Sequence, residues 1–283
     1  MTQVIHQARQ LRALGAGAGP VCVVMTMGAL HRGHAALIEQ ARGQAGAGQV
    51  IVTDFVNPTQ FGAGEDYARY PRTLEQDVVL ATAAGADVVY APDVADVYGF
   101  ADPSALNSLI TIDPGPIGSI LEGAARPGHF AGVLTVVAKL LHLTAADIAI
   151  FGEKDYQQLS LITAMVNDLH FPVEVIGAPT VREDDGLAMS SRNRYLDPAQ
   201  RAAAAVIPAA LRAVQDSAGL GEHAALEAGR AVLDSQPDVE LDYLTITAHD
   251  LGPAPASGAA RVLIAARIGS TRLIDNMPVV LGA

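Results

Sequence analysis

The stretch of sequence that decides the fold passes from a strand into a helix and reads Val23-Val24-Met25-Thr26-Met27-Gly28-Ala29-Leu30-His31-Arg32-Gly33-His34. An apolar run from Val21 to Met25 predicts a buried strand. The strand breaks at Gly28, and helical spacing of apolar residues starts near Gly33. Parallel sheets bind ligands outside the carboxyl ends of their strands, and the N–H groups of a following helix suit phosphate. The stretch therefore predicts a phosphate site.

The same alternation of strand and helix continues through the first two thirds of the chain. Apolar or β-branched runs predict further strands, at Val50–Val56, Val88–Tyr90, Leu109–Ile112, Ile148–Phe151 and Val173–Ile176. Helices are expected between them, and one before them over Ile5–Leu14; Thr73 and Gln76 have capping-box spacing at the start of another. The pattern predicts an α/β fold with a Rossmann-like, doubly wound parallel sheet.

The pattern changes after Arg182. Two alanine-rich helices are expected over residues 198–216 and 222–235, followed by three strands, Leu241–Thr247, Arg261–Ala266 and Thr271–Ile274. Helices followed by consecutive strands predict a second, smaller α+β domain at the C-terminus. We therefore expect a first domain over residues 1–181, which contains the predicted phosphate site, and a second domain over residues 182–283, which could close over that site as a lid.

Charge and cysteine content narrow the function. The formal net charge is −12, which argues against nucleic acid or a membrane surface as the partner. Cys22 is the single cysteine of the 283 residues, so no internal disulfide forms, and its apolar strand indicates core packing. The first residues contain no apolar segment typical of a signal peptide. We expect a cytoplasmic protein with a small-molecule substrate.

His31 and His34 lie three residues apart at the start of the expected helix and can project towards one point. Two imidazoles there could donate hydrogen bonds to phosphate oxygens. A zinc site is a competing interpretation, although no cysteine or carboxylate follows at ligand spacing. The plain alternative is a pair of exposed or helix-capping histidines.

Other polar groups follow strands or precede helices. Asn57 and Gln60, with Phe61, suit a small substrate with hydroxyl and carboxylate groups, unless they form an ordinary turn. Lys154 stands in a Gly-Glu-Lys-Asp turn and suits phosphate, unless it is a solvated loop lysine. Ser190, Ser191 and Arg192 would suit a triphosphate, although a polar interdomain linker is the simpler interpretation of that segment alone. Arg126 and His129 likewise stand at a helix start, where they could simply cap it.

These segments occur together in an order that resembles the pantothenate synthetase family, within the larger group of nucleotidylyltransferases with a HIGH-type signature. The resemblance covers about residues 20 to 200 and rests on the following segments: Met27-Gly28-Ala29-Leu30-His31-Arg32-Gly33-His34, Phe55-Val56-Asn57-Pro58-Thr59-Gln60-Phe61, Tyr70-Pro71-Arg72-Thr73, Leu121-Glu122-Gly123, Arg126-Pro127-Gly128-His129-Phe130, Phe151-Gly152-Glu153-Lys154-Asp155-Tyr156-Gln157-Gln158 and Gly186-Leu187-Ala188-Met189-Ser190-Ser191-Arg192-Asn193.

The resemblance implies a ligase that condenses (R)-pantoate with β-alanine at the expense of ATP. Pantoate would attack the α-phosphorus to give pantoyl adenylate and pyrophosphate, and the amine of β-alanine would then displace AMP. Mg²⁺ is expected with the triphosphate, with Asp77 as a candidate ligand, and a homodimer is implied. A transferase that stops at nucleotidyl transfer, and a non-catalytic nucleotide-binding protein, are the alternatives.

The resemblance also implies roles for single residues. Residues Met27 to His34, Gly152 to Asp155, Val181 and Met189 to Arg192 match ATP-binding positions. Gln60 matches a contact to pantoate and β-alanine, and Gln158 a contact to pantoate; we assign Asn57 and Arg126 to the same substrates. Lys154, His31 and His34 are the catalytic candidates. His34 matches a proton donor, but phosphoryl chemistry relies mainly on positioning, so both imidazoles could instead hold phosphate.

Overall fold

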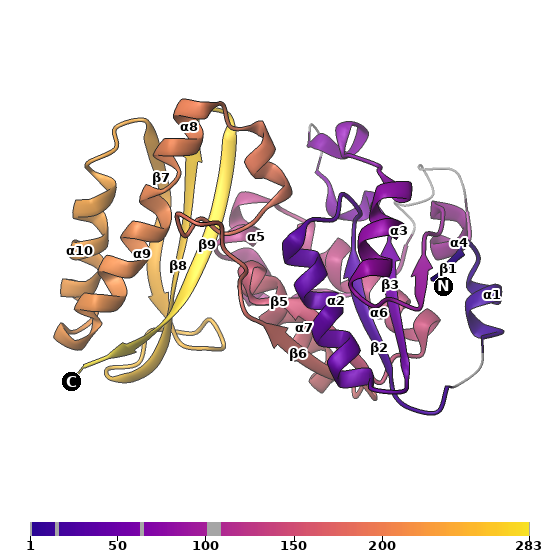
Figure 1. Cartoon of the computed structure of the whole chain (residues 1–283). Coiled ribbons are helices and arrows are strands. Elements are labelled where there is room, and N and C mark those ends of the chain that lie inside the picture. The colour runs from indigo at the N-terminus through magenta and orange to yellow at the C-terminus, as the bar shows by residue number, and fades with distance from the viewer. Residues whose placement is uncertain (1, 15–16, 63–64, 101–108, 283) are drawn as a thin grey trace. The chain divides into compact units, whose positions relative to one another are not determined.

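The computed structural model describes residues 2–14, 17–62, 65–100 and 109–282, and the chain forms two compact units (Figure 1). The first unit contains residues 1–153 and 161–178, and the second contains residues 154–160 and 179–283. The main division therefore falls three residues before the expected boundary at 181. In addition, a short segment that starts at Lys154 belongs to the second unit.

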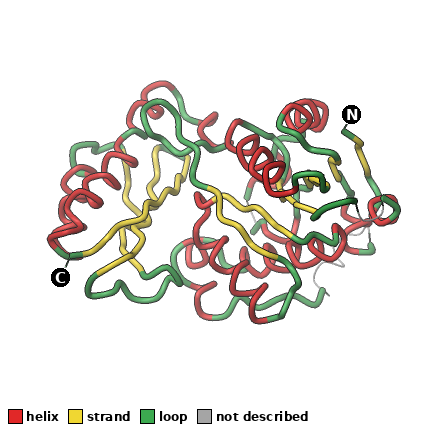
Figure 2. The backbone as a smooth tube through the Cα atoms, turned by 60° about the horizontal axis from the view of Figure 1, so that its bottom comes forward, coloured by secondary structure: helices red, strands yellow, loops and turns green. Residues whose placement is uncertain are grey.

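The first unit is built on a six-stranded sheet, whose strands are yellow in Figure 2. Every neighbouring pair of these strands is parallel. Its spatial order is β1-β4-β3-β2-β5-β6. The strands are β1 Gln3–Ile5, β2 Val21–Thr26, β3 Gln49–Asp54, β4 Val88–Tyr90, β5 Ile148–Gly152 and β6 Glu174–Ala178. The predicted α/β class with a doubly wound parallel sheet is confirmed.

Successive side chains of a strand point to opposite faces of the sheet, and here the side chains on both faces are largely apolar. Helices therefore pack on the sheet. On one face, Cys22 and Val24 of β2 pack with Ile38 of α2 and Ala81 of α3 in one buried cluster. Helix α6 also contacts β2, and α1 packs on α6. The helices of this unit are α1 Ala8–Arg12, α2 Arg32–Ala45, α3 Leu74–Ala83, α4 Val94–Tyr98, α5 Glu122–Ala125, α6 His129–Thr144 and α7 Tyr156–Asp168, the first turn of which belongs to the second unit.

The second unit has a three-stranded antiparallel sheet in the order β7-β8-β9. Helices α9 and α10 pack on each other and on this sheet. Gly229 allows their close approach, because a Cβ there would lie 2.5 Å from Val214 and 2.9 Å from Leu244. The elements are α8 Pro198–Ala203, α9 Val206–Ser217, α10 Glu222–Leu233, β7 Val239–Thr247, β8 Gly258–Ile268 and β9 Thr271–Leu281. The predicted α+β character is confirmed.

Two predicted elements differ from the structure. Of the helix predicted over Ile5–Leu14 only α1, Ala8–Arg12, forms, and Ile5 instead ends strand β1, which pairs with β4. Leu109–Ile112 is not a strand: the N–H of Ile112 donates to the Thr135 hydroxyl at 3.0 Å rather than to a neighbouring strand.

Two details of the predicted helices also differ. The Thr73 hydroxyl donates to the Asp77 carboxylate at 3.0 Å, so the capping box with Gln76 does not form. The single helix expected over residues 198–216 is divided into α8 and α9. Pro208 explains the break, because it has no N–H to donate to the carbonyl of Ala204 four residues earlier.

Candidate active site

Three of the predicted site segments follow neighbouring parallel strands of the first unit. They begin at the carboxyl ends of β2, β3 and β5, which lie at the same edge of the sheet. The chain leaves β2 towards β3 on one side, and β5 lies on the other side of β2. This reversal is the position at which open α/β sheets form a ligand crevice.

The loop after β2 needs glycine at its first turn. Gly28 has a φ of +79°, and a Cβ there would lie 2.5 Å from Oδ1 of Asp54 at the end of β3. The N–H of Gly28 donates to the Thr26 hydroxyl at 3.2 Å, and that hydroxyl donates to the carbonyl of Thr53 at 2.7 Å. The loop is therefore fixed against β3 through its backbone.

Asp77 of α3 holds the next two residues of this loop. Its Oδ2 accepts the N–H of Ala29 at 3.0 Å, and its Oδ1 accepts the N–H of Leu30 at 2.7 Å. The Thr73 hydroxyl also donates to Oδ2. Asp77 is only 2% exposed, so these bonds satisfy a carboxylate that burial would otherwise penalise. Asp77 thus acts as a brace for the loop that carries the two histidines.

Asp54 lies beside this brace. Its pKa is raised to about 7, mainly by burial and then by the charge of Asp77 and a hydrogen bond to that carboxylate. A buried carboxyl group beside a second carboxylate resists ionisation because burial and the neighbouring negative charge both disfavour its charged form. Sequence analysis missed Asp54, although an acidic residue directly after an apolar run was a visible signal.

His31 and His34 form a cap at the start of α2. Nδ1 of His31 accepts the N–H of Gly33 at 3.1 Å, and Nδ1 of His34 accepts the N–H of His31 at 3.3 Å. The ring centroids are 4.1 Å apart. Because both Nδ1 atoms are acceptors, each neutral ring carries its proton on Nε2. Both side chains therefore take part in the cap of α2, and Nε2 is the proton-bearing nitrogen of each ring.

Gln60 lies next to the loop after β2. Its side-chain Nε2 is 3.0 Å from Sδ of Met27, and the residue is 8% exposed. Asn57 orients this amide by donating to its Oε1 at 3.0 Å. The Oδ1 of Asn57 accepts from the Tyr98 hydroxyl at 2.6 Å and from Thr59. Asn57 is 1% exposed, and these bonds favour a role in holding Gln60.

Arg126 and His129 hold the backbone of the same residue. Nη2 of Arg126 donates to the carbonyl of Gln60 at 3.2 Å, and Nδ1 of His129 donates to it at 2.8 Å. Arg126 also forms a two-point ion pair with Glu65, at 2.9 and 2.6 Å, which lowers the pKa of that carboxyl. Arg126 therefore contacts Gln60, the candidate substrate-binding residue, directly.

The segment that starts at Lys154 belongs to the second unit. Lys154 lies in a single turn over Glu153–Asp155, and its Nζ is 3.6 Å from Oδ1 of Asp155. The Lys154 side chain is 17% exposed. Gln158 follows on the first turn of α7 and is half-buried. Gly152 and Glu153, the other members of this predicted ATP segment, are assigned to the first unit.

Val181 and Met189 face each other across a tight turn of the second unit. The N–H of Met189 donates to the carbonyl of Val181 at 2.9 Å, and Arg182 bridges to Ala188. Ser190 caps the following turn by accepting the N–H of Arg192 at 3.2 Å. Val181, the expected adenine contact, and Ser190 to Arg192, the expected triphosphate contacts, are therefore parts of one segment that is held together by hydrogen bonds.

The predicted residues thus form two groups, one in each unit. The first unit brings together the loop from Met27 to His34 with its brace Asp77, and Gln60 with its contacts Asn57 and Arg126. The second unit contains Lys154, Gln158, Val181 and the segment from Met189 to Arg192.

Asp77 does not fit the expected role of helping to hold Mg²⁺. Both of its oxygens already accept backbone N–H groups, whereas Mg²⁺ needs carboxylate oxygens that face it. Over residues 2–14, 17–62, 65–100 and 109–282, no three His, Cys, Asp or Glu side chains cluster as a metal site. Across the same residues, no helix has the length and apolar character needed to cross a membrane.

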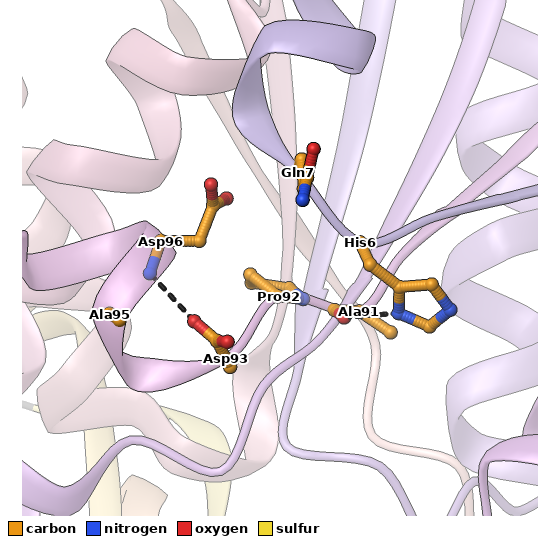
Figure 3. Close-up of a pocket in the computed structure, with 7 residues that line it drawn as sticks. All are labelled: His6, Gln7, Ala91, Pro92, Asp93, Ala95 and Asp96. Atoms are coloured by element: carbon orange, nitrogen blue, oxygen red, sulfur yellow. Dashed lines mark hydrogen bonds between the residues drawn. The ribbon is translucent and has the colours of Figure 1, made fainter. Parts of the chain in front are cut away.

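An open pocket of about 560 Å³ lies beyond the ends of β1 and β4 (Figure 3). Its polar groups serve the local structure. His6 donates from Nδ1 to the carbonyl of Ala91 at 2.8 Å, and Asp93 caps α4 by accepting the N–H of Asp96. Asp96 accepts the N–H of Ala8 and the Tyr90 hydroxyl. None of the predicted site residues lines this pocket.

Comparisons with known proteins agree with these features. A profile of the pantoate-beta-alanine ligase family matches residues 1–278. The pantothenate synthetase of Nocardia farcinica is 54% identical over 276 residues, which cover 98% of this chain and 83% of that protein. The crystal structure of pantothenate synthetase from Thermus thermophilus superposes with a TM-score of 0.89 at 47% identity, covering 98% of this chain and 99% of that one. Pantoate-beta-alanine ligase from Francisella tularensis, complexed with beta-gamma ATP and beta-alanine, gives 0.80 at 35% identity and covers 98% and 97%. The chain belongs to the pantoate–β-alanine ligase family, and its activity is the ligation of pantoate to β-alanine.

Proposed function

We propose that the two groups of residues carry an ATP-dependent ligation through pantoyl adenylate. A pantoate carboxylate oxygen attacks the α-phosphorus of ATP, and the bond to pyrophosphate breaks. The amine of β-alanine then attacks the acyl carbon, loses a proton and expels AMP, which leaves the amide. The observation that carries the proposal is the contact of Gln60 with Met27, because it joins the candidate substrate-binding residue to the loop that contains the two histidines.

His31 and His34 hold the phosphates that leave as pyrophosphate. Their Nδ1 atoms accept backbone N–H groups of the helix cap, so Nε2–H is the side of each ring from which a phosphate oxygen would accept a hydrogen bond. The N-terminus of α2 adds a partial positive charge at the same place. Neutral donors in a fixed position stabilise charge that develops on pyrophosphate, so phosphate binding accounts for both rings. The transfer of a proton by His34 is the alternative.

Gln60 binds pantoate and β-alanine through a side chain that is already oriented. Asn57 holds its amide, and Arg126 and His129 hold its carbonyl. A preorganised amide loses little conformational freedom when the substrate binds. Asn57 and Arg126 therefore contribute to substrate binding through Gln60, and Gln158 provides a second contact to pantoate.

Lys154 and the segment from Val181 to Arg192 bind the nucleotide. Lys154 offers a compact positive charge to the triphosphate, and the Arg192 guanidinium suits the same anion. The backbone at Val181 contacts adenine. We expect Mg²⁺ to bind together with the triphosphate, whose oxygens supply part of its ligands. We also expect a cytoplasmic homodimer.

One assay tests the route. Pantoate labelled with ¹⁸O in its carboxylate is incubated with the protein, ATP, Mg²⁺ and β-alanine. Attack of a carboxylate oxygen on the α-phosphorus places one ¹⁸O in AMP, and pyrophosphate is released with pantoate even when β-alanine is omitted. AMP without label, or release of pyrophosphate that does not depend on pantoate, would overturn the adenylate route.

A further inference from the structure

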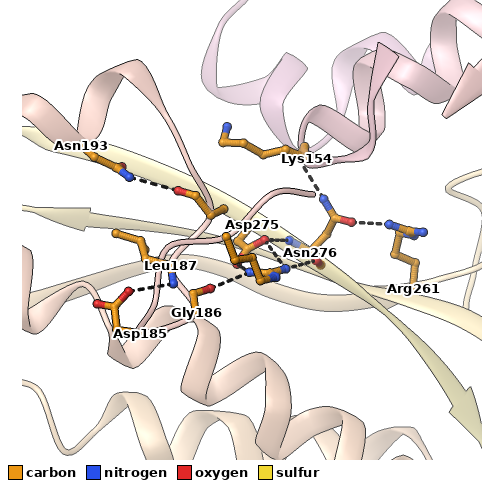
Figure 4. A network of polar contacts seen from close by, with 10 residues as sticks. Lys154, Asp185, Gly186, Leu187, Asn193, Arg261, Asp275 and Asn276 are labelled. Carbon is orange, nitrogen blue, oxygen red and sulfur yellow. Dashed lines mark hydrogen bonds and ion pairs between the residues drawn. The ribbon is translucent and has the colours of Figure 1, made fainter. Parts of the chain in front are cut away.

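Two adjacent residues of β9, Asp275 and Asn276, contact the two segments of the second unit that are proposed to bind the nucleotide (Figure 4). These segments are the turn at Lys154 and the stretch from Val181 to Arg192. Asn276 is 3% exposed, and its Nδ2 donates to the backbone carbonyl of Lys154 at 2.9 Å. Arg261 donates to the other end of the amide, at Oδ1. This second bond fixes the orientation of the amide, so that Nδ2 faces Lys154.

Asp275 reaches the other segment through Arg182, the residue next to Val181. Nη1 and Nη2 of Arg182 contact the carboxylate of Asp275 at 2.7 and 3.0 Å, in a two-point ion pair. Arg182 also donates to the carbonyl of Gly186 at 2.9 Å and to that of Asn276 at 3.2 Å. The Asp275 side chain is 1% exposed, and its charge is matched in full by this geometry.

A third contact ties the Lys154 segment to the same strands. The Arg261 guanidinium lies over the ring of Tyr156, 4.0 Å from its centroid. Tyr156 is the first residue of α7 and stands two positions after Lys154. A desolvated guanidinium over an aromatic ring is a favourable contact. All of these residues belong to the second unit, which explains why the Lys154 segment is grouped with it.

We propose that Asp275 and Asn276 are positioning residues that hold the Lys154 turn and the Val181–Arg192 segment in one fixed arrangement for ATP. The inference rests on the proposed function of those two segments. Neither residue needs to touch the nucleotide. Misplacement of a binding group by about 1 Å can lower a rate about 100-fold. We call Asp275 and Asn276 the two anchors, and loss of the contacts of either one weakens the binding of ATP. Gln60, the pantoate contact of the first unit, is touched by neither residue, so we expect a smaller effect on pantoate binding than on ATP binding, even though Gln158, on α7, follows Lys154 in the chain.

Isosteric variants test the two anchors. Asn276→Asp keeps the acceptor for Arg261 but removes the donor to Lys154, and Asp275→Asn weakens the pair with Arg182. We expect each to raise the KM for ATP at least about tenfold, and to raise the KM for pantoate, which also binds Gln60 of the first unit, by a clearly smaller factor. Asp242→Asn is the matched control, because Asp242 of β7 pairs at 2.8 Å with Arg272 of β9, which belongs to neither segment.

A double variant separates positioning from general damage. If Asn276 acts through Lys154, Asn276→Asp has no further effect in a Lys154→Ala background. An unchanged KM for ATP in Asn276→Asp and Asp275→Asn, beside an impaired Lys154→Ala, overturns the positioning role alone. A wild-type rate for Lys154→Ala overturns the assigned role of Lys154 together with that of Asn276. If Asn276→Asp does not fold, Asn276→Ser, which is uncharged and too short to reach the carbonyl, replaces it in the same comparison.

Discussion

The ring of His34 accepts the backbone N–H of His31 at Nδ1, 3.3 Å away, so its Nε2 carries the proton of the neutral ring. This contact leads to a test of how His34 acts. His34→Ala removes the donor, and we expect the adenylation rate to fall at least about 100-fold, which corresponds to about 2.7 kcal/mol of transition-state stabilisation. Pantoate-dependent exchange of pyrophosphate into ATP measures this step.

Two amide variants distinguish phosphate binding from proton transfer. A glutamine amide reaches the position of Nε2, whereas an asparagine amide reaches that of Nδ1. If His34 only holds phosphate, His34→Gln keeps markedly more exchange activity than His34→Asn. Equal, alanine-like rates for both variants would favour proton transfer, and a wild-type rate for His34→Ala would refute either role.

Lys154 can be tested against a natural control. Lys154→Ala removes the positive charge from the triphosphate, and we expect the adenylation rate to fall at least about 100-fold. Lys139 is the other lysine of the chain and lies over the ring of Tyr98, 5.4 Å from its centroid. Lys139→Ala costs some stability but leaves pyrophosphate exchange near the wild-type rate. Equal losses in the two variants would contradict a specific role for Lys154.

The parts of the fold and site that were predictable have local signals. The run from Val21 to Met25 indicated β2 because a buried strand needs continuous apolar residues. Gly28 and the two histidines were visible because a strand end directly precedes a helix start. The structure has these features at the same positions, although β2 extends one residue beyond the predicted strand, to Thr26, which pairs with Asp54.

The parts that were missed depend on residues far away in the sequence. Strand β1 has three residues and exists because β4, more than eighty positions later, pairs with it. The brace from Asp77 to Leu30 spans 47 positions, and the anchor from Asn276 to Lys154 spans 122. Such partners have no periodicity or motif that a single sequence displays, so their carboxylates and amides resemble ordinary surface residues.

A variant of Asp77 tests whether this residue braces the loop after β2 or binds a metal ion. Asp77→Asn replaces one acceptor of the two backbone N–H groups by an amide donor, so we expect a stability loss of about 1–3 kcal/mol and a higher KM for ATP. Because the loop itself moves, raising the Mg²⁺ concentration does not restore activity. Rescue of the KM by excess Mg²⁺ would instead show that Asp77 binds the ion. Glu75→Gln, an exposed change on the same helix, is the control.

The raised pKa of Asp54 predicts a dependence of stability on pH. Asp54 keeps its proton up to about pH 7 in the folded protein, whereas the unfolded chain loses it near its ordinary value of 3.8. Between these values the folded state binds more protons, so the free energy of unfolding falls as pH rises from about 4 to about 7. Asp54→Asn imitates the protonated form and does not titrate. Urea denaturation at several pH values should therefore show a flatter profile for this variant, with its largest relative gain at pH 8, and an unchanged slope would contradict the assignment.

Gly132 of α6 links packing to substrate binding. A Cβ at this position would lie 2.2 Å from the carbonyl oxygen of Thr59 and 2.8 Å from the N atom of Gln60. Gly132→Ala therefore pushes the turn that holds Gln60, and we expect a stability loss of about 1–3 kcal/mol together with a higher KM for pantoate. Gly43→Ala is the matched control in α2, because no atom lies within 4 Å of its added Cβ, and it should gain about 0.5–1 kcal/mol from reduced backbone entropy. Urea denaturation and steady-state kinetics measure both effects. A wild-type KM for pantoate in a destabilised Gly132→Ala protein would show that the turn can move without disturbing Gln60.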